Sequence, residues 1–206
     1  MNTFQKFISE NQLWVGVIVG VLLTRAMEML MRPSISFKLS DDQEFARSNK
    51  KYKFINLIVS NNKRNFLKKF LFGHSSINNA RVWLRFKDYS SKVNILNIDG
   101  RWASTKEPVD YNTNKIIFSE VILPSRDTIP VGEQAAVSVA IKESGEDSFF
   151  AFNNQSYSHS WKNPDYELAD KKYWLEILLL ADGEEYKYTL LLINPSKSLS
   201  NFKLLK

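Results

Sequence analysis

The chain of 206 residues has no cysteine, seven glycines and two histidines. Without cysteine it can form no disulfide framework, and a zinc site would have to be assembled from scattered carboxylates. His74 and His159 lie far apart, and neither has a carboxylate beside it at ligand spacing. Seven glycines leave little material for a phosphate-binding loop, and no such motif occurs. These absences argue against metal catalysis and nucleotide hydrolysis, so we expect no metal and no cofactor.

Long apolar runs are also scarce, and one stands out at residues 13–23 (LWVGVIVGVLL). These residues alone are too few, because a helix needs about 20 residues to cross a hydrocarbon core of ~30 Å. Arg25 and Glu28 follow at a spacing that lets them pair on a helix, and Pro33 predicts a helix end at residue 31 or 32. We therefore predict a short N-terminal tail (1–10) and a single transmembrane helix (11–32).

Two other interpretations of this segment are a cleaved signal peptide and a buried helix of the globular domain. Lys6 and the apolar run suit a signal peptide, but Thr24, Arg25 and Ala26 make a poor cleavage site. A buried helix is disfavoured because a strand-like segment follows Pro33 at once and no other segment is helical enough to pack beside it. We favour an uncleaved membrane anchor.

The predicted helix carries two further signals. Gly16 and Gly20 have the small-xxx-small spacing that permits close helix approach in lipid, which predicts self-association and a homo-oligomer. Lys6 precedes the helix, whereas several basic residues, Arg25 and Arg32 among them, lie at or beyond its other end. Because positive charge accumulates on the cytoplasmic side, we expect a cytoplasmic C-terminal domain.

The rest of the chain is patterned as short strands with turn residues between them. Alternation of apolar and polar residues predicts an antiparallel immunoglobulin-like β-sandwich over residues 33–195, followed by a flexible basic tail (196–206). The Asp182-Gly183 dipeptide predicts a tight hairpin, because both residue types tolerate positive φ. The predicted strands are 34–39, 52–60, 80–86, 93–99, 115–123, 135–141, 148–152, 173–180 and 185–193.

Four segments of this domain are similar to segments of a known group of proteins. They read YKFINLIVSN, NNARVWLRF, GRWASTKEPV and KYWLEILLLADGEEYKYTLLLINP, and include Asn61, Ala80, Arg101, Trp102 and Pro108. The chain resembles uncharacterised prokaryotic proteins in which an N-terminal membrane helix precedes an immunoglobulin-like sandwich. The resemblance implies a fold and a membrane tether, and it carries no active-site residues.

A basic, aromatic segment at residues 62–78 separates two predicted strands. If it is helical, Phe66, Leu67, Phe70 and Leu71 share one face, which is typical of a short amphipathic element. Such an element could cap the domain's own core, lie on an anionic membrane or contact a partner. The candidate contact residues are Lys63, Arg64, Phe66, Leu67, Lys68, Lys69, Phe70, Leu71 and Phe72.

Arg101 and Trp102 are a second candidate contact, because together they could present a cation and an aromatic face to a ligand. The alternative is structural, with Trp102 closing the end of the sandwich and Arg101 pairing with an acid. The net charge of +6 is spread along the chain and accompanies no nucleic-acid motif, so we do not expect a nucleic-acid partner.

Our leading hypothesis is a non-catalytic, single-pass membrane protein whose β-sandwich binds a macromolecule, most simply a protein, at the membrane surface. A membrane-tethered hydrolase with His159 and carboxylates in a cleft is the first alternative. A structural role through oligomerisation is the second.

Overall fold

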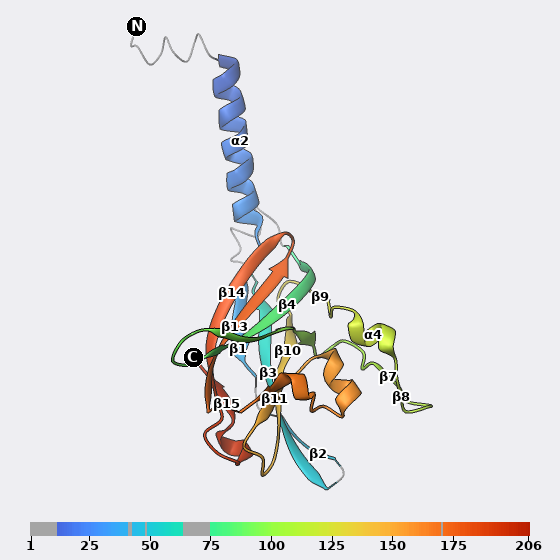
Figure 1. The fold of residues 1–206 in the computed structure, drawn as a ribbon. Coiled ribbons are helices and arrows are strands. Elements are labelled where there is room, and N and C mark those ends of the chain that lie inside the picture. Colours follow the sequence, from blue (N-terminus) through green and yellow to red (C-terminus); the bar gives the residue numbers. More distant parts are fainter. Residues whose placement is uncertain (1–11, 41–42, 48, 64–74, 170) are drawn as a thin grey trace.

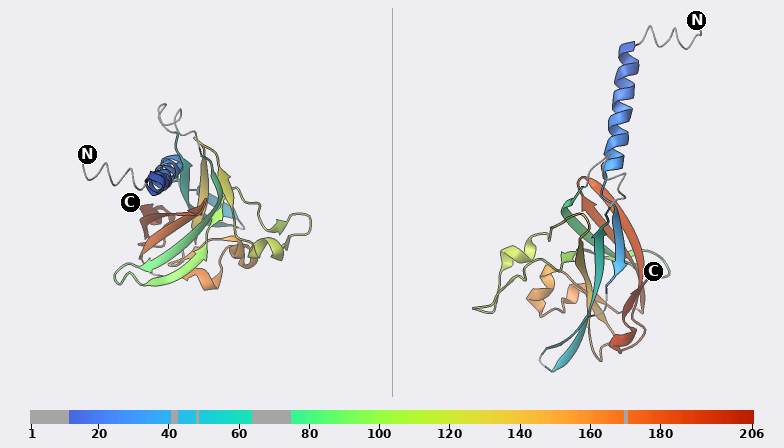
Figure 2. Two further views of the ribbon diagram at one scale, coloured as in Figure 1. Left: turned by 90° about the horizontal axis from the view of Figure 1, so that it is seen from above. Right: turned by 180° about the vertical axis from the view of Figure 1, so that it is seen from behind.

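The computed structural model describes residues 12–40, 43–47, 49–63, 75–169 and 171–206. Helix α2 (Gln12–Met31) projects from one end of a body of antiparallel strands, as Figures 1 and 2 show from three sides. The sequence predicts a transmembrane helix over 11–32, and the helix itself is confirmed to within one residue at each end. Among the described residues, no helix combines the length and the apolarity that crossing a membrane requires.

The first sheet has seven strands, and β3 and β10 form its centre. Strand β1 pairs with the last residues of β3 and β2 with the first, whereas β10 pairs with β3 on its other side. The strands are β1 (Ile35–Leu39), β2 (Gln43–Arg47), β3 (Lys50–Asn61), β6 (Arg101–Trp102), β10 (Gln134–Glu143), β11 (Phe149–Ala151) and β12 (Glu167–Leu168).

The second sheet has six strands and is centred on β4 and β13. The β13–β14 hairpin turns at Asp182 and Gly183, both at positive φ (51° and 77°), which confirms the predicted turn. The strands are β4 (Ile77–Asp88), β5 (Asn94–Asp99), β9 (Asp127–Ile129), β13 (Lys172–Ala181), β14 (Glu184–Ile193) and β15 (Lys203–Leu205).

The core lies between the two sheets. Strand residues point alternately to the two faces of a sheet, so Ile55, Leu57 and Val59 of β3 face inward and meet residues such as Leu84 and Phe86 of β4. Burying one such side chain stabilises the fold by about 1.5–3 kcal/mol. The chain is therefore mainly β, with antiparallel sheets packed on one continuous core.

An excursion between β6 and β9 projects from the side of the body (Figure 2). It contains a two-stranded ribbon, β7 (Val109–Asp110) with β8 (Lys115–Ile116), and the short helix α4 (Phe118–Ile122). The predicted strand at 115–123 is therefore wrong beyond its first two residues. Phe118, Val121 and Ile122 have helical rather than alternating spacing, and α4 buries only Val121 of its five residues.

The C-terminal segment is also different from the prediction of a flexible tail. Its short 3-10 helix η3 (Leu199–Asn201) leads into β15, which pairs with β14. Phe202 is fully buried, and its ring centroid lies 5.0 Å from that of Phe149. The prediction failed because it weighed the lysines and overlooked the apolar side chains that complete the core.

Candidate functional site

A cluster of aromatic residues, separate from the main core, lies on the outer face of the first sheet. Tyr52 and Phe54 of β3 point to this face because they alternate with the inward-facing Ile55. The segment after β11, which includes the 3-10 helix η1 (Asn154–His159), adds Phe152, Tyr157 and Trp161.

The rings of this cluster pack edge to face. The centroid of Phe54 lies 5.0 Å from that of Phe152, at 86° between the ring planes, and 5.4 Å from that of Trp161, at 78°. Such pairs add about 0.5–1.5 kcal/mol each beyond the area they bury. The cluster thus holds the segment after β11 firmly against the sheet.

A row of three polar side chains crosses this face beside the cluster. Ser138 of β10 pairs directly with Asn56 of β3 on one side and with Arg101 of β6 on the other. The three side chains are buried, with exposed fractions of 9% for Asn56, 6% for Ser138 and 4% for Arg101. The sheet register therefore places an amide, a hydroxyl and a guanidinium side by side.

The aromatic cluster and the polar row line one groove with a volume of about 390 Å³, which we call the aromatic groove. This volume falls in the range of roughly 300–1,000 Å³ that is typical of small-ligand sites. Phe45, from the protruding strand β2, lies at the groove with 47% of its surface exposed. The lining residues are Gln43, Phe45, Phe54, Asn56, Arg101, Ala103, Glu107, Ser138, Phe152, Tyr157 and Trp161.

Arg101 is held by the backbone that surrounds it. Its guanidinium donates from Nη1 to the carbonyl of Trp102 at 3.2 Å and from Nη2 to that of Thr105, and it lies 5.3 Å from the ring centroid of Tyr157. Its Nε is buried and has no hydrogen-bond partner among the described residues. Arg101 therefore places a fixed positive charge in the groove wall.

Glu107 is the acidic member of the groove. Its Oε1 accepts from the hydroxyl of Tyr157 at 3.1 Å, and its Oε2 accepts from the hydroxyl of Tyr111 at 2.6 Å. Burial raises the pKa of Tyr157 well above its ordinary value, and the charge of Glu107 adds to this effect although Arg101 opposes it. Tyr157 is thus a neutral hydrogen-bond donor at physiological pH.

The positions of Arg101 and Trp102 only partly match the predicted surface contact. Trp102 is fully buried, and its indole N–H donates to the carbonyl oxygen of Ala80 at 2.9 Å. Adjacent strand residues point to opposite faces, so Trp102 enters the core while Arg101 reaches the aromatic groove. The prediction of Trp102 as a surface contact is wrong.

Most of the predicted basic, aromatic contact lies outside the described residues, which include neither Arg64 nor Phe66 to Phe72. Of that set the structure describes Lys63, which is exposed. Gly16 and Gly20 are exposed on α2, and a Cβ at either position would meet no atom within 4 Å. Self-association through these glycines stays a prediction.

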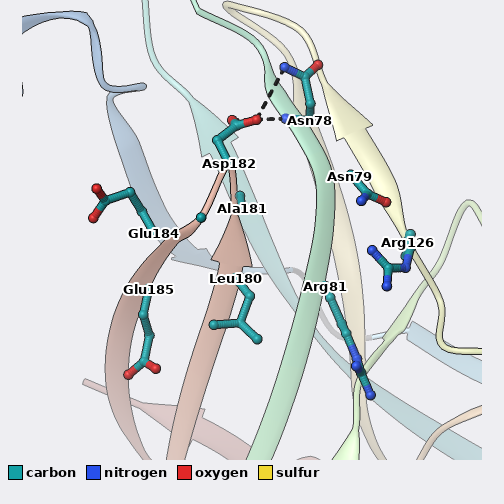
Figure 3. Close-up of a pocket in the computed structure, with 10 residues that line it drawn as sticks. Asn78, Asn79, Arg81, Arg126, Leu180, Ala181, Asp182, Glu184 and Glu185 are labelled. Carbon is teal, nitrogen blue, oxygen red and sulfur yellow. Dashed lines mark hydrogen bonds between the residues drawn. The ribbon is translucent and has the colours of Figure 1, made fainter. Parts of the chain in front are cut away.

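A larger cavity of about 600 Å³ lies beside the β13–β14 hairpin (Figure 3). Several of its polar groups already have partners in the protein. Asp182 accepts from the backbone and side-chain nitrogens of Asn78 at 3.3 and 3.5 Å, Arg81 pairs with Asp99 at 2.6 Å, and Glu184 pairs with Arg32 at 2.5 Å. The aromatic groove is the better candidate, because it combines apolar rings with buried polar side chains.

His159, which the hydrolase hypothesis places in a cleft, is exposed at the end of η1. No carboxylate of the described residues forms an ion pair with it. Within the same ranges, no group of three or more histidines and carboxylates has an arrangement that could hold a metal ion.

Comparison with known proteins adds little. No family model matches the sequence, and no curated protein matches it. A solved structure titled "X-ray structure of Northeast Structural Genomics Consortium target SoR45" aligns with 80% of this chain and 87% of its own, at 9% identity and a TM-score of 0.29. This similarity is too low to carry an argument about fold or function.

Proposed function

We propose that this protein is a membrane-anchored, immunoglobulin-like β-sandwich that binds a macromolecular partner through the aromatic groove without catalysing a reaction. The observation that carries the proposal is the placement of the apolar helix α2 and of strand β2, whose Phe45 lines the aromatic groove, at opposite ends of the β-body. Helix α2 projects from one end, and strand β2, which forms part of the groove, protrudes at the other (Figure 1).

The anchor is supported by the apolar circumference of α2. Successive helix residues point about 100° apart, so Val17, Ile18 and Val19 face three different directions, and each is exposed by 47–57%. A helix that is apolar all round is normally covered by lipid or by the core of a large protein. The other exposed apolar residues between positions 14 and 23 are Trp14, Val21, Leu22 and Leu23.

The apolar run of residues 13–23 is about 16 Å long as a helix, roughly half of a hydrocarbon core. We place this run in lipid, with Arg25 and Arg32 at the level of the headgroups. Positive charge on this side of the run favours a cytoplasmic β-body.

The pairing of the strands supports the immunoglobulin-like assignment. The order β1-β3-β10 in one sheet corresponds to strands A, B and E of an immunoglobulin fold, and β4-β13-β14 in the other corresponds to C, F and G. Chain order agrees as well, and β5 beside β4 takes the place of an additional C′ strand.

Membrane fractionation of the full-length chain tests the anchor. Replacing both Ile18 and Leu22 by Arg introduces two charges into α2, each of which costs about 2.5–3.5 kcal/mol at the centre of a lipid-embedded helix. Phe118→Arg with Ile122→Arg is the matched control, because these residues are exposed, apolar and equally spaced on α4 of the β-body.

We expect the wild type and the α4 variant in the carbonate-washed membrane pellet and the α2 variant in the soluble fraction. A soluble wild type, or an α2 variant that stays in the pellet, would overturn the anchor. Protease treatment of intact spheroplasts then tests orientation, since a cytoplasmic β-body is cleaved only after lysis.

A further inference from the structure

We infer that the aromatic groove binds a sugar residue, that is, a polyhydroxylated ring with an apolar C–H face and either no charge or a carboxylate. The inference rests on the proposed binding function and specifies the chemical class of the partner as a glycan. It follows from the hydrogen-bonding groups, the exposed rings and the charges of the groove.

The first step is the unmet hydrogen-bonding capacity of the polar row. Asn56 and Ser138 face each other across β3 and β10, and both are more than nine-tenths buried. Within the described ranges, neither the amide of Asn56 nor the hydroxyl of Ser138 has a hydrogen-bond partner. An amide and a hydroxyl each donate and accept, so a ligand must do both in order to satisfy them. Sugar hydroxyl groups meet this requirement.

The second step concerns the apolar wall. The rings of Phe45 and Phe54 line the groove, and Phe45 is half-exposed on strand β2, which protrudes from the body (Figure 1). An aromatic face suits the C–H side of a sugar ring, which leaves the hydroxyl groups for the polar row. A purely aliphatic ligand such as an acyl chain would cover the rings but leave Asn56 and Ser138 buried and unpaired, at a cost of about 1–3 kcal/mol for each group.

The third step is charge. The guanidinium of Arg101 lies 5.3 Å from the ring centroid of Tyr157, and that of Arg47 lies 4.4 Å from the ring centroid of Trp161. These two rings, where an external cation would bind, are thus already taken by the protein's own arginines. Glu107 accepts hydrogen bonds from two tyrosines and is the only carboxylate among the described residues that line the groove. A neutral or acidic sugar fits this balance better than an amine or a quaternary ammonium ion.

The test is a binding titration of the full-length protein by tryptophan fluorescence and calorimetry. The detergent must be of the polyoxyethylene type, because maltoside and glucoside detergents carry the proposed ligand class. The probes are cellobiose, N,N′-diacetylchitobiose and glucuronic acid at millimolar concentrations, with benzyltrimethylammonium as the cationic comparison.

Ser138→Ala removes a hydroxyl inside the groove, and Ser60→Ala is its matched control. Ser60 lies on the same face of β3, is 7% exposed and has an unpartnered hydroxyl, but it does not line the groove. We expect saturable binding of at least one sugar, a tenfold or greater loss of affinity in Ser138→Ala, and no change in Ser60→Ala. Asn56→Ala, checked for folding by thermal denaturation, should lose affinity to a similar extent.

Absence of saturable binding by all three sugars, binding of the ammonium probe alone, or equal affinity of the two serine variants would overturn the inference. Sugar binding and membrane association are measured on the same protein. A protein that pellets with membranes and binds no sugar therefore refutes the sugar assignment and leaves the anchor intact. A soluble protein that binds sugar refutes the anchor and leaves the sugar assignment intact.

Discussion

The indole N–H of Trp102 donates to the backbone carbonyl of Ala80 at 2.9 Å, and this hydrogen bond joins the two sheets of the sandwich. Trp102 belongs to β6 of the first sheet and Ala80 to β4 of the second. The backbone N–H of Trp102 also donates to the hydroxyl of Ser125 at 2.9 Å. A single buried residue thus connects the core, the opposite sheet and the end of the lateral excursion.

Trp102→Phe should lower the free energy of unfolding by about 1–3 kcal/mol, because it removes the buried hydrogen bond to the carbonyl of Ala80 and leaves part of the space of the indole empty. Urea denaturation followed by circular dichroism measures the change. Trp83→Phe is the control, since Trp83 lies on the outer face of the second sheet and is only partly buried. Equal losses in the two variants would contradict a special role for the bond to Ala80.

Gly100→Ala should destabilise the fold by about 1–3 kcal/mol through overpacking. A Cβ at position 100 would lie 2.9 Å from Cγ1 of Val82 and 3.2 Å from its carbonyl oxygen, to which Gly100 donates at 2.7 Å. Thermal denaturation measures the loss, and Gly16→Ala, where the added Cβ meets nothing within 4 Å, should leave the β-body unchanged. Adding Val82→Ala to Gly100→Ala should cost less than the sum of the single changes, and strict additivity would refute the steric explanation.

The surroundings of Glu176 lead us to predict a specific pH dependence of the free energy of unfolding. Its carboxylate is 4% exposed and lies 2.8 Å from Nζ of Lys87, 2.5 Å from Nζ of Lys187 and 3.2 Å from Nη1 of Arg85. Burial raises the pKa of Glu176, but the hydrogen bonds from Lys187 and Lys87 outweigh burial and lower the pKa to about 2. The folded state therefore keeps Glu176 ionised at pH values where the unfolded chain protonates it.

The stabilisation from Glu176 is complete above pH 4.5, its ordinary pKa, and is lost as the pH falls toward about 2. Glu176→Gln should cost about 1–3 kcal/mol at neutral pH and should flatten the decline of unfolding free energy below pH 4.5. Denaturation curves at several pH values test this, with the exposed Glu133→Gln as control. A decline as steep in Glu176→Gln as in the wild type would contradict the assignment.

Phe202→Ala should destabilise the protein by about 3–5 kcal/mol, because it opens a cavity beside Phe149. The exposed Lys206→Ala should have almost no effect. Hydrogen exchange would then show faster exchange across β14 and β15 in Phe202→Ala, since the two strands pair at Leu191–Ile193 and Lys203–Leu205. If Phe202→Ala left the free energy of unfolding unchanged, the C-terminal segment would be a loose tail, as the sequence predicts.

Much of the fold could be predicted because its strands and turns are specified by residues that are neighbours in the sequence. Strands such as β3 and β4 alternate clearly, and Asp182-Gly183 specifies its own turn. The segment after residue 115 was mispredicted because its apolar residues suit a strand or a single helical turn, and the lack of a neighbouring strand decides between them. The tail was mispredicted because burial of Phe202 depends on partners far away in sequence.

The aromatic groove could not be predicted because it depends on register between distant strands. Asn56, Ser138 and Arg101 become neighbours only when β3, β10 and β6 pair as they do. One signal was present in the sequence. Tyr52, Phe54 and Ile58 occupy the face of β3 opposite to Ile55, Leu57 and Val59, and a strand that is apolar on both faces is covered on both.

Strand β3 runs without interruption from the base of α2 to the groove and so sets the distance between them. Asn61 pairs with Ile35 near the base of α2, and seven residues separate it from Phe54 at the groove, a distance of about 23 Å at ~3.3 Å per residue. Because β3 is one continuous strand between these two points, this spacing is fixed by the fold. If α2 is anchored in lipid as we propose, a sugar attached directly to a lipid headgroup would lie too low to reach the groove, and the inferred ligand would come from a longer glycan chain or from solution.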